Sequence, residues 1–129
     1  MPTLHIKRVY ERPSPEDGVR ILVDRLWPRG LTKEAAALDY WCKDIAPSPE
    51  LRKWFDHRED RFDEFRRRYR LELKSNPSLP EFRKLAKPGK ATLLYAAHDA
   101  KVNHAVVLAE YIQALKAKAP PKRRSVRKS

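Results

Sequence analysis

The hydrophobic pattern of the chain contains two short apolar runs. One is Ile21-Leu22-Val23, inside a strand that we expect over residues 20–26, and the other covers residues 91–96. Uninterrupted apolar runs of this length predict strands that are covered on both faces of a sheet. Residues 4–10 alternate apolar and polar positions, which predicts a strand with one covered face. Residues 38–45 alternate in part, and we interpret them as a short strand or extended segment.

Helical spacing dominates the rest of the chain. In residues 60–74 the apolar side chains recur at intervals of three and four, and such a stripe predicts a helix with one buried face. Pro49 suits the first helical position after Ser48, and Thr32 resembles an N-cap. The expected helices cover residues 34–37, 48–55, 60–74, 80–85 and 101–115.

Strands that alternate with helices predict an α/β fold, here a small single domain with a short, mainly parallel sheet flanked by helices. The segment between Leu26 and Ala91 is long and mostly helical, as a connection between parallel strands requires. We therefore expect residues 20–26 and 91–96 to be neighbouring parallel strands. The helix over residues 101–115 is expected to pack against them.

Composition agrees with a single domain. The chain has 129 residues, of which 41% are hydrophobic and 36% charged, enough for one modest core under a charged surface. The sequence has no apolar run of about 18 residues that would predict a membrane span, and its first residues lack the order of a secretion signal. Cys42 is the only cysteine, so no intrachain disulfide can form. We expect a cytoplasmic protein without a membrane partner.

The net charge of +12 is unevenly distributed. The last fourteen residues hold seven basic residues and no acidic residue. We expect one α/β domain over residues 1–117 and a disordered basic tail over residues 118–129. The tail could bind nucleic acid or another acidic surface, or it could remain solvated without a partner.

The run Arg66–Arg68 in the predicted helix over residues 60–74 also suggests nucleic acid. Acidic residues stand four positions earlier on the same helix, however, and this order favours ion pairs on a solvated face. The expected pairs are Asp63 with Arg67 and Glu64 with Arg68.

The segment Val23–Gly30 carries the most informative chemistry, because it places charged and aromatic residues at the end of a predicted strand. Proline stops a central strand and glycine permits a turn, and ligands bind at strand ends in α/β folds. Arginine suits carboxylate and phosphate groups. The expected ligand-binding residues here are Asp24, Arg25, Trp27 and Arg29, with Asp24 orienting Arg25. The alternative is a structural salt bridge, with Trp27 in the core and a simple turn after it.

The start of the last predicted helix offers a second group of polar residues. Asn103 and His104 fall in its first turn, and Asp99 is expected to cap it. Free backbone N–H groups at a helix start favour anions. His104 could act as a catalytic acid or base, or as a neutral histidine that donates to a backbone carbonyl.

If the strands are parallel, three segments deliver polar groups to one sheet edge. The first strand contributes Lys7 and Tyr10, the second contributes the residues named above, and the last strand–helix junction contributes His98, Asp99, Asn103 and His104. We expect a pocket for an anionic small molecule, with or without a reaction. The alternative is a nucleic-acid-binding or regulatory protein that acts through its basic tail and arginine-rich helix.

No metal site and no cofactor are expected. His98 and His104 are six residues apart, which is not a familiar zinc spacing, and no cysteine pair accompanies them. With three glycines, the chain contains neither a dinucleotide-binding nor a P-loop fingerprint. The substrate and the oligomeric state do not follow from the sequence.

Four motifs in this order resemble the YeaO-like family, also called domain of unknown function 488. They are Lys7-Arg8-Val9-Tyr10, the segment Val23–Gly30, Leu51-Arg52-Lys53-Trp54-Phe55 and Asn103-His104-Ala105. The resemblance covers about residues 4–115 and implies a small cytoplasmic α/β domain, with no particular reaction attached. Longer relatives carry cysteines near the positions of Tyr95 and Asn103, where this chain has none, which argues against a thiol-based mechanism.

Overall fold

The computed structural model describes residues 3–118 and contains four strands and five α-helices in this part of the chain. The strands are β1 (His5–Arg8), β2 (Val19–Leu22), β3 (Tyr40–Trp41) and β4 (Ala91–Tyr95). The helices are α1 (Lys33–Ala36), α2 (Pro49–Phe55), α3 (Phe62–Lys74), α4 (Leu79–Leu85) and α5 (His104–Lys118). Short 3₁₀ helices lie at Pro15–Asp17, Lys43–Ile45 and Glu59–Arg61. Nearly all of the predicted tail, from residue 119 onward, lies outside the described residues, so its disorder stays a prediction.

The four strands form one parallel sheet in the order β1-β4-β2-β3. Strand β4 lies at the centre, with its Ala91 paired to Val19 of β2. The prediction of two neighbouring parallel strands joined by a helical crossover is therefore confirmed, as is the α/β class. The edge strand β3, which the sequence predicted as a short strand or extended segment, has two residues.

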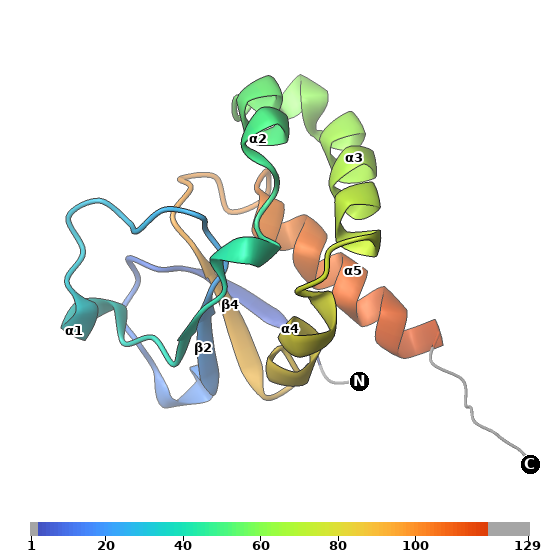
Figure 1. Ribbon diagram of the computed structural model, residues 1–129. Helices are drawn as coiled ribbons and strands as arrows, with labels where there is room; N and C mark the ends of the chain where they lie inside the picture. The colour runs from blue at the N-terminus through green and yellow to red at the C-terminus, as the bar shows by residue number, and fades with distance from the viewer. Residues whose placement is uncertain (1–2, 119–129) are drawn as a thin grey trace, which may run out of the picture.

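The two faces of the sheet are covered unequally (Figure 1). Alternation along the strands sends Ile21 and Leu93 into the main core, which helices α2 to α5 complete. Leu22 and Leu94 point to the other face, where Ala36 of α1 and the loop around it form a smaller cluster. Both central strands are thus buried on both sides, which explains the adjacent apolar pairs Ile21-Leu22 and Leu93-Leu94.

Helix α3 buries the apolar stripe that its sequence spacing predicted. Phe65, Tyr69 and Leu73 are buried, and the Tyr69 hydroxyl donates a 2.7 Å hydrogen bond to the Ile45 carbonyl. On the outer face, Glu64 accepts hydrogen bonds from Arg67 and Arg68. The Glu64–Arg68 pair was predicted, whereas the expected Asp63–Arg67 pair is wrong: Asp63 pairs with Arg66 at 3.2 Å, and Arg67 instead turns to Glu64.

Helix α5 begins three residues later than predicted, because local side chains hold the preceding residues in a turn. The Asp99 Oδ1 atom accepts hydrogen bonds from the N–H groups of Lys101 and Val102. Asn103 is the residue that caps α5, since its Oδ1 accepts the Val106 N–H at 3.0 Å. The expectation that Asp99 caps the helix itself is therefore corrected.

In the described part of the chain, no helix combines the length and apolarity that a membrane span requires.

Candidate functional site

A cavity of about 500 Å³ opens at the carboxyl ends of β2 and β4. Its walls come from the residues after β2, from α2 with the segments at its two ends, and from the connection between β4 and α5. The cavity includes six of the sequence-predicted site residues: Asp24, Arg25, His98, Asp99, Asn103 and His104. The prediction that separate segments meet at this sheet edge is realised for these six.

Asp24, just after β2, contacts both the end of β4 and the first residue of α5. Its Oδ2 atom accepts a hydrogen bond from the Ala96 N–H at 3.0 Å. Its Oδ1 atom lies 3.0 Å from His104 Nε2, yet it makes no hydrogen bond within the described residues. Asp24 forms no ion pair with Arg25 in this part of the chain, because its carboxylate is turned toward β4 and α5. The expected orienting pair is thus replaced by contacts to Ala96 and His104.

His104 fastens the first turn of α5 to the end of β2. Its Nε2 atom lies 3.0 Å from the Val23 carbonyl oxygen. A carbonyl oxygen can only accept, so this contact assigns the proton to Nε2. His104 therefore donates to a backbone carbonyl, which is one of the two roles that the sequence predicted for it. The other role, as a catalytic acid or base, stays a prediction.

Arg25 lines the cavity. It forms no ion pair with a carboxylate among the described residues. Its Nη2 group donates long hydrogen bonds to the carbonyls of Ala46 at 3.3 Å and Pro47 at 3.4 Å. Its Nε–H is buried and makes no hydrogen bond in this part of the chain. A guanidinium held by weak contacts to neutral carbonyls keeps its charge available to a ligand.

The connection from β4 to α5 is fixed by its own polar groups. The Asn103 side chain is buried and donates through Nδ2 to the Asp99 carbonyl at 2.7 Å. The backbone N–H groups of Lys101 and Val102 lower the pKa of Asp99, although desolvation opposes the shift. Asp99 and Asn103 therefore shape the loop, while His98 is exposed at the cavity.

Two polar residues of the cavity, Arg52 of α2 and His57 just after it, were not predicted from the sequence. Arg52 makes no side-chain hydrogen bond or ion pair within the described residues. The signal that could have found it is the motif Leu51–Phe55, in which Arg52 stands between two residues that are buried in the core. His57 adopts a left-handed backbone conformation, with φ of 54°, which no sequence pattern indicated.

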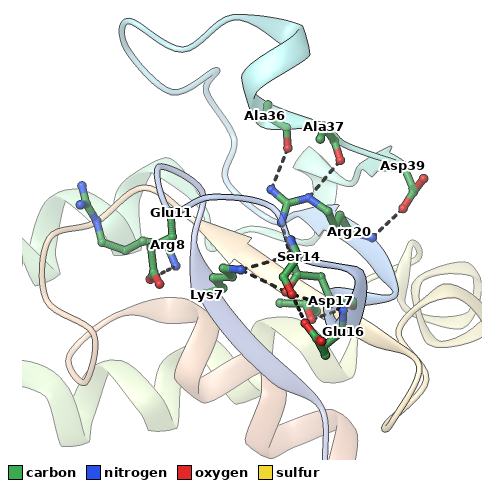
Figure 2. Close-up of polar contacts among 11 residues, drawn as sticks. Lys7, Arg8, Glu11, Ser14, Glu16, Asp17, Arg20, Ala36, Ala37 and Asp39 are labelled. Atoms are coloured by element: carbon green, nitrogen blue, oxygen red, sulfur yellow. Dashed lines mark hydrogen bonds and ion pairs between the residues drawn. The ribbon is translucent and has the colours of Figure 1, made fainter.

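Lys7 does not reach the cavity, because it serves a buried carboxylate at the other end of the sheet. Figure 2 shows Lys7, Ser14 and Arg20 converging on Asp17. The Lys7 Nζ atom lies 3.1 Å from Asp17 Oδ1. Burial alone would raise the pKa of Asp17, but the hydrogen bonds from Ser14, Lys7 and Arg20 outweigh it and lower the pKa.

Tyr10, Trp27 and Arg29 also lie outside the cavity lining. The Tyr10 hydroxyl donates to the Arg29 carbonyl at 2.8 Å, and the Arg29 side chain is exposed. Trp27 packs on the smaller apolar cluster, and its Nε1–H donates to the Leu31 carbonyl at 2.7 Å. Trp27 thus packs in the core and is followed by a simple turn, which is the structural alternative to a ligand-binding role. Arg25, two residues earlier, faces the cavity.

The cavity combines charged, hydrogen-bonding and apolar groups. Arg25 and Arg52 supply positive charge, and both lining carboxylates, Asp24 and Asp99, accept hydrogen bonds from backbone N–H groups. Phe55 and Phe65 give the cavity an apolar wall. No group of three or more His, Cys, Asp or Glu residues that could hold a metal ion is present in the described part of the chain.

Comparison with known proteins places the chain among small bacterial relatives. A family model described as the inactive DUF488-N3 subclade matches residues 3–127. The uncharacterized protein Rv3073c of Mycobacterium tuberculosis (strain H37Rv) is 45% identical over 109 residues, which cover 84% of this chain and 92% of the relative. The uncharacterized protein YeaO of Escherichia coli (strain K12) is 44% identical over 113 residues, which cover 87% and 98%. No solved structure matches the chain.

The match over nearly the whole chain, together with the coverage of both relatives, confirms the resemblance carried by the four sequence motifs. The chain belongs to the DUF488 family, as a YeaO-like member of the subclade described as inactive.

Proposed function

We propose that this protein binds a small anionic molecule in the cavity at the carboxyl edge of its sheet. The observation that carries the proposal is that Arg25 and Arg52 line the cavity without a carboxylate partner among the described residues. Arg20 and Arg66, by contrast, each pair with a carboxylate. An arginine in a concave site without an acidic partner is complementary to carboxylate or phosphate.

The size and the walls of the cavity fit a ligand with an organic part. A volume of about 500 Å³ falls in the range of small-molecule sites, which combine apolar walls with a few polar groups. Phe55 and Phe65 would face the apolar part of the ligand. Arg25, Arg52 and the exposed His98 would face its anionic part.

Catalysis by a serine, cysteine or lysine nucleophile does not fit the cavity, because its lining residues include none of the three. Cys42 is not among them, and desolvation, followed by the nearby Asp44, raises the pKa of its thiol, which disfavours the reactive thiolate. The description of the matching subclade as inactive is in keeping with a protein that holds its ligand rather than converting it.

The proposal is tested by titrating the protein with inorganic phosphate in a calorimeter at low salt. Arg25→Gln is expected to lower the affinity by about tenfold or more, because a hydrogen bond from a charged donor contributes about 1.5–3 kcal/mol. Arg83→Gln is the matched control, since it removes the same charge from an exposed position outside the cavity. Equal losses in the two variants would mean that phosphate responds only to net charge and would overturn the proposal.

The nucleic-acid hypothesis gains no support from the described residues. The arginines of α3 that suggested it pair with Asp63, Glu64 and Glu110, and the tail lies outside the described part of the chain. A role of residues 118–129 in nucleic-acid binding therefore stays a prediction, and a steep dependence of binding on salt concentration would support it.

A further inference from the structure

The end of helix α2 holds two consecutive residues in a left-handed conformation. Asp56 has φ of 49° and His57 has φ of 54°. Ala37 is the one other non-glycine residue with positive φ within residues 3–118. A side chain on Cβ makes this conformation costly, so it persists only where the surrounding structure requires it.

Helix capping explains the first of the two residues. Asp56 is the C-cap of α2, and its N–H donates to the Arg52 carbonyl, which is the ordinary left-handed ending of a helix. That ending needs one residue in this conformation, whereas here a second follows directly. The second residue, His57, is exposed and lines the cavity, with its ring centroid 6.3 Å from that of Phe55. The second strained residue is thus one that belongs to the candidate site.

The cavity extends along α2, with cationic or hydrogen-bonding side chains at both ends of the helix. The Arg25 guanidinium contacts the carbonyls of Ala46 and Pro47, just before α2 begins. His57 comes two residues after its last residue, Phe55, and Arg52 lies between these ends. A helix of seven residues is about 10 Å long at 1.5 Å per residue. The hydrogen-bond donors of Arg25, Arg52 and His57 are therefore spread along the cavity and are not collected at one point.

We propose that His57, beyond Arg52 along α2, forms a second anion contact, and that the natural ligand carries two separated anionic groups or one extended oligophosphate. The inference rests on the proposed anion site, which it extends from Arg25 toward the far end of α2. One end of such a ligand meets Arg25 and the other meets His57. A single small anion reaches one of these contacts and leaves the other unused.

Two probes separate this inference from the simpler anion site. Inorganic phosphate presents one anionic group, whereas tripolyphosphate presents a row of three. We expect the unaltered protein to bind tripolyphosphate at least tenfold more tightly than phosphate in calorimetric titrations. His57→Gly is expected to remove most of this advantage while changing the phosphate affinity by less than twofold.

The same substitution provides a second readout that involves no ligand. Glycine adopts positive φ without strain, so His57→Gly should raise the melting temperature by about 4 °C. Ala37→Gly is the matched control: it relieves the same backbone conformation at the end of α1 and should raise the melting temperature without altering either affinity. Only His57→Gly should both raise the melting temperature and weaken tripolyphosphate binding. That combination would mean that the strained conformation of His57 is kept because the residue contacts the ligand.

The outcomes distinguish the two proposals. If the unaltered protein binds tripolyphosphate no better than phosphate, or if His57→Gly keeps the full advantage, the second contact is wrong and the Arg25 site stands. If the unaltered protein binds neither probe, the anion site itself is wrong and the extension fails with it.

Discussion

At the amino end of the sheet Asp17 is surrounded by groups that satisfy it, whereas at the carboxyl end Asp24 and Arg25 are adjacent in sequence but do not pair. Asp17 receives hydrogen bonds from Lys7, Arg20 and the Ser14 N–H. At the other end, Asp24 Oδ1 lies 3.0 Å from His104 Nε2, which also contacts the Val23 carbonyl, and Arg25 Nε is buried without a hydrogen bond in the described part of the chain. Polar groups that serve only the fold are normally paired, so the incomplete pairing marks the carboxyl end as the place with capacity for a ligand.

The largest effect on stability is expected from Asp17→Ala. Removing this buried carboxylate leaves Lys7 and Arg20 facing each other without their common partner, and breaking a buried pair in this way costs about 3 kcal/mol or more. The free energy of unfolding in urea measures the loss. Asp60→Ala removes an exposed ion pair and should leave that free energy nearly unchanged. Similar values for the two variants would contradict the assigned role of Asp17.

A smaller loss, of about 1–2 kcal/mol, is expected from Asn103→Ala, because this change removes the N-cap of α5. Thermal or urea unfolding monitored by circular dichroism measures it. Asn103→Ser keeps an acceptor for the Val106 N–H and should recover most of the loss. If serine fails to recover stability, the bond from Asn103 Nδ2 to Asp99 matters more than the cap.

The pH dependence of stability should test whether the charge of Asp17 stabilises the amino end of the sheet. Burial raises the pKa of Asp17, but its hydrogen bonds outweigh burial and hold the pKa below that of the unfolded chain. Its contribution is therefore present above about pH 4 and is lost as the pH falls through the folded-state pKa. The difference in free energy of unfolding between the unaltered protein and Asp17→Asn should narrow below pH 4. A constant difference would show that the charge of Asp17 is not what stabilises this end.

The smallest effect on stability is expected from Arg25→Gln, which should change the free energy of unfolding by less than about 1 kcal/mol. Its hydrogen bonds to Ala46 and Pro47 are 3.3 and 3.4 Å long and involve neutral carbonyls. The same variant is expected to lose phosphate affinity, so binding and folding should separate at this residue. Strong destabilisation, measured by urea unfolding, would mean that Arg25 serves the fold in the way that Asp17 does.

The fold could be predicted from the sequence because its main signals are local. Buried runs such as Ile21–Val23 have no polar position to face solvent, so they specify central strands, and a helical crossover makes these strands parallel. The start of α5 was less predictable. Both Asp99 and Asn103 are good capping residues, and only the turn formed by Lys101 and Val102 decides between them.

The site could be predicted where strand ends determine position, and not where a side chain can turn to either face. Asp24 and His104 meet because β2 and β4 end together. Arg29 follows a turn whose direction the sequence does not specify, and its side chain points into solvent. His57 was missed because its position depends on a left-handed backbone conformation of a non-glycine residue, which propensity alone does not predict.

Within residues 3–118 the sheet ends in two edge strands, and their composition bears on how the protein behaves at high concentration. Strand β3 offers two residues at one edge, while β1 at the other edge is four residues long and includes Lys7 and Arg8. Short and charged edge strands are poor templates for further strand pairing. The chain is thereby protected against the edge-to-edge aggregation to which an open parallel sheet is exposed.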